Sequence, residues 1–117
     1  MIHDEVTCAQ YTSTIRGLND ELRREMPHGR VILTRAVAAL DPVTLAAIIT
    51  AIREFDDFTP DNDPWGEHDF GQVFNGEGVP LFWKIDAYDL AMEFGSPDPT
   101  DDAVTKRILT IMTADDL

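Results

Sequence analysis

The sequence predicts an α+β fold, in which an antiparallel sheet of three to four strands has about three helices packed on it. Three observations lead to this prediction. Two segments repeat apolar residues at helical spacing, residues 79–87 alternate as a strand does, and a glycine-containing turn at 75–78 joins two predicted strands. The chain has 117 residues, of which 44% are hydrophobic, and it shows no internal repeat or linker. It is therefore expected to form a single domain over residues 1–117.

The first predicted helix spans residues 7–25. Residues on one face of this helix recur at spacings of three and four: Cys8, Tyr11, Ile15, Leu18 and Leu22. Pro27 and Gly29 end it. A short β-branched run at 31–34 follows, which is typical of a buried strand.

A second helix is predicted over residues 42–54. Asp41 is a suitable N-cap, and Pro42 suits the first helical position. The apolar stripe recurs at i, i+3, i+4 and i+7: Leu45, Ile48, Ile49 and Ile52. The following segment, 55–66, contains two prolines and several aspartates, so we expect a loop there.

Residues 67–74 and 79–87 are predicted to form a β-hairpin around the Asn-Gly-Glu-Gly turn at 75–78. Four alternating residues should face the core: Val79, Leu81, Trp83 and Ile85. The residues between them should take the other face: Phe82, Lys84 and Asp86.

The C-terminal third is predicted to contain a short strand around 90–94 and a last helix that opens at Asp98. Its buried stripe would be Val104, Ile108, Ile111 and Met112. The expected order is therefore α-β-α-β-β-(β)-α.

The whole net charge of −13 comes from one segment, residues 54–102. This segment contains fourteen acids and a single basic residue, Lys84, whereas the flanking parts of the chain are neutral. Concentrated like charge destabilises a fold by self-repulsion, and it is typical of a very soluble protein or of one with a strongly positive partner.

The composition excludes several classes of function. A polyanion does not bind nucleic acid or an anionic membrane directly. A single cysteine, Cys8, excludes an internal disulfide framework and fits a reducing compartment. Residues 1–5 do not resemble a secretory signal, and no apolar run has the length of a membrane span. We therefore expect a soluble protein of the bacterial cytoplasm.

A metal site is one reading of the acidic segment. Asp61, Asp63, His68 and Asp69 could form a metal-assisted hydrolytic centre. An EF-hand is excluded, because counting from Asp61 places Trp65 and Gln72 where the loop needs oxygen ligands. The alternative is that His68 packs its ring or bonds to a neighbouring carboxylate. The other histidines, His3 and His28, fall in expected terminal or loop regions.

Nucleophilic catalysis has no support in the sequence. Cys8 is expected on the apolar face of the first helix, where a thiol is inert packing, and Ser96 resembles a turn residue. The chain contains no glycine-rich phosphate loop. It is therefore not expected to be an enzyme or to carry a cofactor.

The acidic residues also suggest a surface that imitates a nucleic-acid backbone. Residues i and i+2 of a strand lie on one face, roughly 6.6–6.8 Å apart, so Glu67 and Asp69 would form an evenly spaced pair. Such a surface would bind the Lys/Arg groove of a DNA- or RNA-binding protein. The predicted contact residues are Asp56, Asp57, Asp61, Asp63, Glu67, Asp69, Asp86, Asp89 and Glu93. The alternative is a solvated acidic face that only keeps the protein soluble.

Several motifs resemble those of a small bacterial family of unknown function. They are FDDFTPDNDPWGEHDFG at 55–71, FWKID at 82–86, Tyr88-Asp89, FGSPDP at 94–99, and the ending from Val104 to Met112. The resemblance covers about residues 18–112. It implies a single-domain protein associated with plasmids and other mobile elements, and it carries over no catalytic residue. Because the motifs include core-like residues such as Trp65 and Phe70, much of the pattern can specify the fold.

Size, acidity and the implied mobile-element association also make the chain similar to anti-CRISPR proteins. This similarity implies an inhibitor that occupies the basic DNA-binding channel of a type I interference (Cascade) complex, with a Cas backbone subunit as the partner. Two alternatives stay open. One is the metal-assisted hydrolase, and the other is an acidic interaction module that binds through the Phe and Trp side chains of the loop, Trp65 above all.

Overall fold

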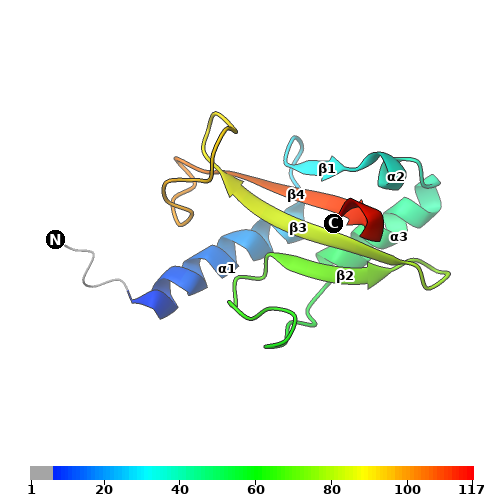
Figure 1. Cartoon of the computed structure of the whole chain (residues 1–117), viewed down its shortest axis with the longest axis horizontal. Helices are drawn as coiled ribbons and strands as arrows, with labels where there is room; N and C mark the ends of the chain where they lie inside the picture. Colours follow the sequence, from blue (N-terminus) through cyan, green and yellow to red (C-terminus); the bar gives the residue numbers. More distant parts are fainter. Residues whose placement is uncertain (1–6) are drawn as a thin grey trace.

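A computed structural model describes residues 7–117 and arranges four strands in the order β1-β4-β3-β2 (Figure 1). The helices are α1 (Cys8–Glu25), α2 (Arg35–Ala38) and α3 (Pro42–Arg53), and the strands are β1 (Val31–Leu33), β2 (Phe70–Phe74), β3 (Pro80–Tyr88) and β4 (Lys106–Thr113). The predicted α+β fold is confirmed. The sheet is mixed rather than purely antiparallel, because β1 runs parallel to β4 while the other two pairings are antiparallel.

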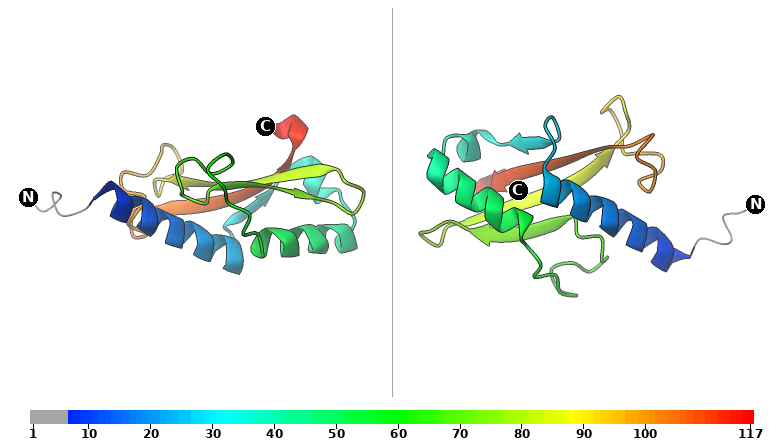
Figure 2. Two further views of the ribbon diagram at one scale, coloured as in Figure 1. Left: turned by 90° about the horizontal axis from the view of Figure 1, so that it is seen from below. Right: turned by 180° about the vertical axis from the view of Figure 1, so that it is seen from behind.

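The long helices α1 and α3 lie on one face of the sheet, and a final 3-10 turn, Ala114–Asp116, lies on the other (Figure 2). The core between helices and sheet is almost wholly aliphatic around one tryptophan: Val37, Ile48, Ile52, Trp83, Leu109 and Ile111. No helix within residues 7–117 is long and apolar enough to cross a membrane. His3 falls outside the described part of the chain.

Helix α1 begins where the sequence predicts, because Thr7 and Gln10 form a capping box, with each side chain accepting from the other residue's backbone N–H. Its first turn extends beyond the end of the sheet (Figure 1). Cys8 is therefore exposed, and the expectation that its thiol packs in the core is wrong. The buried face is half polar, because Asn19 and Arg23 are buried beside Ile15 and Leu22.

The predicted second helix, α3, and the predicted hairpin of β2 and β3 are confirmed. Asp41 caps α3 by accepting from Thr44 N at 2.9 Å, and Ile48 and Ile52 are buried. In the hairpin, the core-facing residues of β3 are Leu81, Trp83 and Ile85. Val79 belongs to the turn and is 50% exposed.

Strand β4 replaces the predicted last helix, and this prediction is wrong. Ile108 and Met112 are four residues apart, a spacing that places them on one face of a helix and equally on one face of a strand. As β4 is a central strand covered on both sides, Leu109 and Ile111 on the opposite face are buried too. The apolar run therefore lacks the alternation that marks a half-exposed strand.

Three smaller differences concern the ends of elements. The strand predicted over 90–94 is a turn, which closes with an isolated bridge between Tyr88 and Gly95. The predicted strand 67–74 begins only at Phe70. One helical turn, α2, was not predicted, since four residues are too few for an apolar period to appear.

Candidate functional site

The loop that joins α3 to β2, residues 55–69 (the 55–69 loop), is attached to helix α1 by side-chain hydrogen bonds. Arg16 Nε donates to the Gly66 carbonyl at 2.6 Å, and Asn19 Nδ2 donates to the Glu67 carbonyl at 2.9 Å. A third α1 side chain, Asp20, accepts at 2.8 Å from the His68 ring. These contacts span about fifty positions of sequence, so tertiary packing determines the course of the loop.

Arg23 lies buried beneath the start of this loop. Its guanidinium donates to the carbonyls of Ile52 and Arg53, at 3.0 and 3.2 Å, and to Asp20 at 3.0 Å. Its guanidinium carbon also lies 5.5 Å from the ring centres of both Phe58 and Trp83. A buried charge needs such partners, because desolvation without them costs several kcal/mol.

His68 has a structural role. Its ring stacks on Phe58, with the ring centres 3.6 Å apart and the planes within 3°. Nδ1 lies 2.8 Å from Asp20 Oδ1, and Nε2 lies 3.6 Å from Asp63 Oδ2. Both ring nitrogens therefore already face carboxylates of the protein.

The residues proposed for a metal centre do not converge. Asp63 contacts the His68 ring. Asp69 follows His68, whose backbone is in the left-handed region at φ 55°, and it lines a different cleft. In the described range, 7–117, no group of three or more His, Cys, Asp or Glu side chains has a geometry that could hold a metal ion.

The outer part of the loop is held by its own hydrogen bonds and exposes one large aromatic residue. Thr59 N donates to Asn62 Oδ1 at 2.9 Å, and Asn62 Nδ2 donates to the Asp57 carbonyl at 2.8 Å. Trp65 is 79% exposed. Beside it, a cleft of about 460 Å³ is lined by Arg16, Phe58, Pro60, Pro64 and His68 among others.

The nine predicted contact residues fall into three groups. Within the part of the chain that the structure describes, four are exposed and have no side-chain hydrogen bond or ion pair: Asp56, Asp57, Asp61 and Glu93. Three have partners inside the protein, Asp63 with His68, Asp86 with Lys84 at 3.3 Å, and Asp89 with the backbone of Glu93 and Phe94. The last two, Glu67 and Asp69, line a cleft.

This cleft, of about 270 Å³, lies between α1, β3 and residue Pro99. Burial raises the pKa of Glu67 and of Asp69, and neighbouring carboxylates raise both further. Arg107 is the cation that faces them, and burial lowers its pKa even though Asp102 accepts from it at 2.8 Å. In this cleft the ionised forms of Glu67 and Asp69 are therefore disfavoured.

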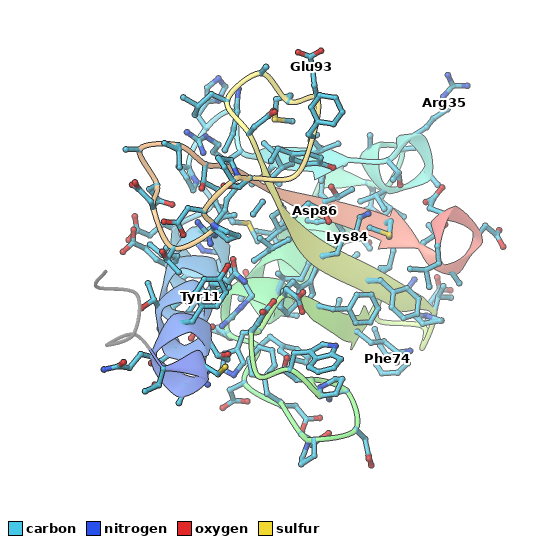
Figure 3. The ribbon with its side chains drawn as sticks, turned by 60° about the vertical axis from the view of Figure 1, so that its left-hand side comes forward. Tyr11, Arg35, Phe74, Lys84, Asp86 and Glu93 are labelled. Carbon is cyan, nitrogen blue, oxygen red and sulfur yellow. The ribbon has the colours of Figure 1, made fainter. Side chains whose placement is uncertain are left out.

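The acidic residues do not form one even row. Glu67 and Asp69 precede β2, so the predicted strand spacing between them is absent. Figure 3 shows Glu93 at the opposite end of the molecule from the 55–69 loop, with Asp86 and Lys84 between them. The exposed carboxylates that share the 55–69 loop with the exposed Trp65 are those of Asp56, Asp57 and Asp61.

Sequence reasoning missed the α1 residues that hold the loop: Arg16, Asn19, Asp20 and Arg23. A signal was present, because these positions recur at i, i+3, i+4 and i+7. Apolar residues are the usual marker of this spacing, but a polar stripe at the same spacing also places side chains on one helix face.

Comparison with known proteins identifies a family for this chain but assigns no function to it. No match was found among curated proteins or among solved structures. The family described as "Protein of unknown function (DUF3768)" matches residues 33–116, which include α2, α3, the whole 55–69 loop and three of the four strands in full. The motifs that resemble a family of unknown function all lie in this range, and the chain belongs to the DUF3768 family.

Proposed function

We propose that this protein is a binding protein, with no catalytic role, whose 55–69 loop docks on the basic, nucleic-acid-binding surface of a partner protein. The observation that carries the proposal is a loop with three exposed carboxylates and an exposed tryptophan that is nevertheless held by partly buried polar contacts to α1. A loop that served only solubility would need no such attachment.

Preorganisation is the physical reason that this arrangement suits binding. Side chains that are already ordered lose less conformational entropy on association. Asp56, Asp57 and Asp61 provide long-range attraction to Lys and Arg, which raises the association rate. Trp65 provides the apolar area that typically dominates the energy of an interface.

For the partner, we propose a Cas backbone subunit of a type I interference complex, with the protein acting as an anti-CRISPR inhibitor in the bacterial cytoplasm. The support is the net charge of −13 and its concentration in one segment. The basic channel that holds DNA in such a complex would attract this charge, and occupation of the channel would exclude the target DNA.

The test is a pull-down of purified type I effector complex, and of its separate subunits, at about 50 mM and about 500 mM salt. We expect capture at low salt, loss at high salt, and at least tenfold weaker binding for the triple variant Asp56→Lys, Asp57→Lys, Asp61→Lys. The matched control reverses three exposed acids outside the loop, Glu21, Glu25 and Asp115. Each variant changes the net charge from −13 to −7, because three reversals add two charges each.

Trp65→Ala distinguishes binding that uses Trp65 as an anchor from binding through the acidic residues alone. A loss of about thirtyfold in affinity makes Trp65 an anchor of the interface, whereas unchanged affinity assigns binding to charge alone. Equal losses in the loop variant and in its matched control contradict the site. Absence of capture at low salt contradicts the proposed partner.

A further inference from the structure

Strand β2 is an edge strand of the sheet, and no other strand within residues 7–117 pairs with the outer side of its backbone. Ile85 N donates to the Asp69 carbonyl at 2.8 Å, and Asn75 N donates to the Val79 carbonyl at 3.0 Å. Hydrogen-bonded positions alternate in an antiparallel pair, so Gly71 and Val73 also bond to β3. The N–H and C=O groups of Phe70, Gln72 and Phe74 consequently point away from the sheet.

The usual protections of an edge strand are missing from β2. Natural edges carry a lysine, a proline or a bulge that blocks the addition of another strand. The β2 sequence, Phe-Gly-Gln-Val-Phe, has no charge and no proline, and its register with β3 is regular from Phe70 opposite Lys84 to Phe74 opposite Pro80. The opposite edge, β1, is only three residues long.

Aromatic side chains occupy the face of the sheet beside this edge. Phe70 stacks with Phe82, with the ring centres 5.7 Å apart, and Phe74 is 59% exposed and extends from the strand into solvent (Figure 3). Every second residue of an added strand would point to the same face and pack against these rings.

Charge determines which strand fits. The 55–69 loop projects past the free edge beside the start of β2, as Figures 1 and 2 show, and the turn after β2 carries exposed Glu77. An added strand would therefore have acidic residues at both of its ends. A second copy of this chain would bring its own acidic loop against Glu77, and each copy carries −13.

We propose that β2 receives an extended, basic segment of the partner as a fifth strand of the sheet. Apolar residues of that segment pack on Phe70 and Phe74, and flanking Lys or Arg residues meet the 55–69 loop at one end and Glu77 at the other. This inference rests on the proposed function, because it specifies how a basic partner is held.

The experiment measures amide hydrogen exchange of the wild-type protein with and without the peptide Lys-Lys-Val-Thr-Val-Lys-Lys. Strand addition slows exchange at Phe70, Gln72 and Phe74 by at least about tenfold, since these amides gain partners. A control peptide with the same charges, Lys-Lys-Pro-Thr-Pro-Lys-Lys, cannot form the strand. The proposal is overturned if saturating Val peptide slows none of the three amides, or if both peptides slow them equally.

Two variants test the same point by affinity. Gln72→Pro removes an outward N–H without removing a hydrogen bond to β3 and should weaken binding of the Val peptide about tenfold, whereas Gln72→Thr keeps the N–H and should bind as the wild type does. Equal affinity for both variants overturns the proposal, and the exchange measurement on the wild type stands if Gln72→Pro does not fold. Protection of the three amides that rises with protein concentration without peptide also overturns it, in favour of self-association.

The pull-down distinguishes failure of this inference from failure of the proposed function. If Gln72→Pro and the wild type capture the effector complex equally, the edge strand is excluded while the acidic loop stands. If the complex is not captured although the Val peptide protects the three amides, the proposed partner fails while strand addition stands.

Discussion

Two acidic loops of this protein are held in different ways. The 55–69 loop carries six acids and the loop joining β3 to β4, residues 89–105 (the 89–105 loop), carries five, and neither contains Lys or Arg. The first is attached to α1 by Arg16, Asn19 and Asp20. The second is held largely by short-range bonds, such as those from Phe94 N to Asp89 and from Thr100 N to Asp98.

The two loops differ in the sequence range of the hydrogen bonds that hold them. The contacts of the 55–69 loop with α1 are partly buried and join residues 48 to 50 positions apart, so removing one detaches the loop from a distant part of the chain and leaves a partly buried polar group without its partner. The hydrogen bonds of the 89–105 loop join residues at most nine positions apart, and at the exposed ones, such as that from Phe94 N to Asp89, water can replace a lost partner. Two acidic loops therefore differ in their support, because one depends on helix α1 and the other depends mainly on its own residues.

The largest expected effect is that of Arg23→Met. The substitution removes the guanidinium from Phe58 and Trp83 and from the carbonyls of Ile52 and Arg53, of which that of Ile52 keeps a backbone donor, Phe55 N. The expected loss is about 3 kcal/mol in the free energy of unfolding, or roughly 10 °C in Tm, measured by thermal denaturation. Arg24→Met on the exposed side of α1 should change stability by less than about 0.5 kcal/mol. Equal effects of the two variants would show that the buried network does not hold the loop.

Gly71→Ala should have the next largest effect. A Cβ at Gly71 would lie 2.5 Å from Nε1 of the opposite Trp83, and that indole is wholly buried against Phe55 and Phe58. Overpacking at such a site costs about 1–3 kcal/mol, measurable by urea denaturation. Gly76→Ala in the hairpin turn meets no atom within 4 Å and serves as the control. A Gly71→Ala protein as stable as this control would contradict the packing of Trp83.

Asp69→Asn tests the cleft where the two loops approach each other. The folded-state pKa of Asp69 is raised, so its ionised form destabilises the fold at neutral pH, and stability increases as the pH falls through that pKa. Asp69→Asn should therefore raise Tm at pH about 7, by less than Gly71→Ala lowers it, and the gain should vanish near pH 3. A lower Tm at neutral pH would mean that the ionised Asp69 stabilises the fold, contrary to this prediction.

Asp98→Ala should have the smallest effect, with the opposite dependence on pH. The hydrogen bonds from Thr100 lower the pKa of Asp98, so its contribution to stability is present at neutral pH and is lost as the pH falls through the lowered value. The substitution should lower Tm slightly at neutral pH and should have no effect at strongly acidic pH. A fall in Tm as large as that of Arg23→Met would refute the contrast between the two loops.

The parts of the fold that sequence patterns predicted correctly are those with local signals. The helix over Cys8–Glu25 has a cap and an apolar spacing, and the helix over Pro42–Arg53 has Asp41 and Pro42 at its start. The hairpin has a turn sequence and strict alternation. In each case neighbouring residues alone favour one backbone conformation, so no knowledge of the rest of the chain was needed.

The site was only partly predictable. The acidic segment and Trp65 are visible in the sequence, but their grouping is not. Asp63 and Asp89 bond within the protein, whereas Asp56, Asp57 and Asp61 are exposed in the loop that carries Trp65. Periodicity cannot separate these cases, because an aspartate that caps a turn and one that faces a partner have the same local sequence.

The sequence by itself determined two long helices, a hairpin and a concentration of negative charge between residues 54 and 102. Tertiary structure alone decided that Lys106–Thr113 is a central strand, that β1 joins it in parallel, and that polar residues of α1 hold the 55–69 loop. The physical reason is the range of the interactions. Caps, turns and apolar periods act within a few residues, whereas burial on both faces of a strand and the pairing of buried polar groups depend on segments far apart in the chain.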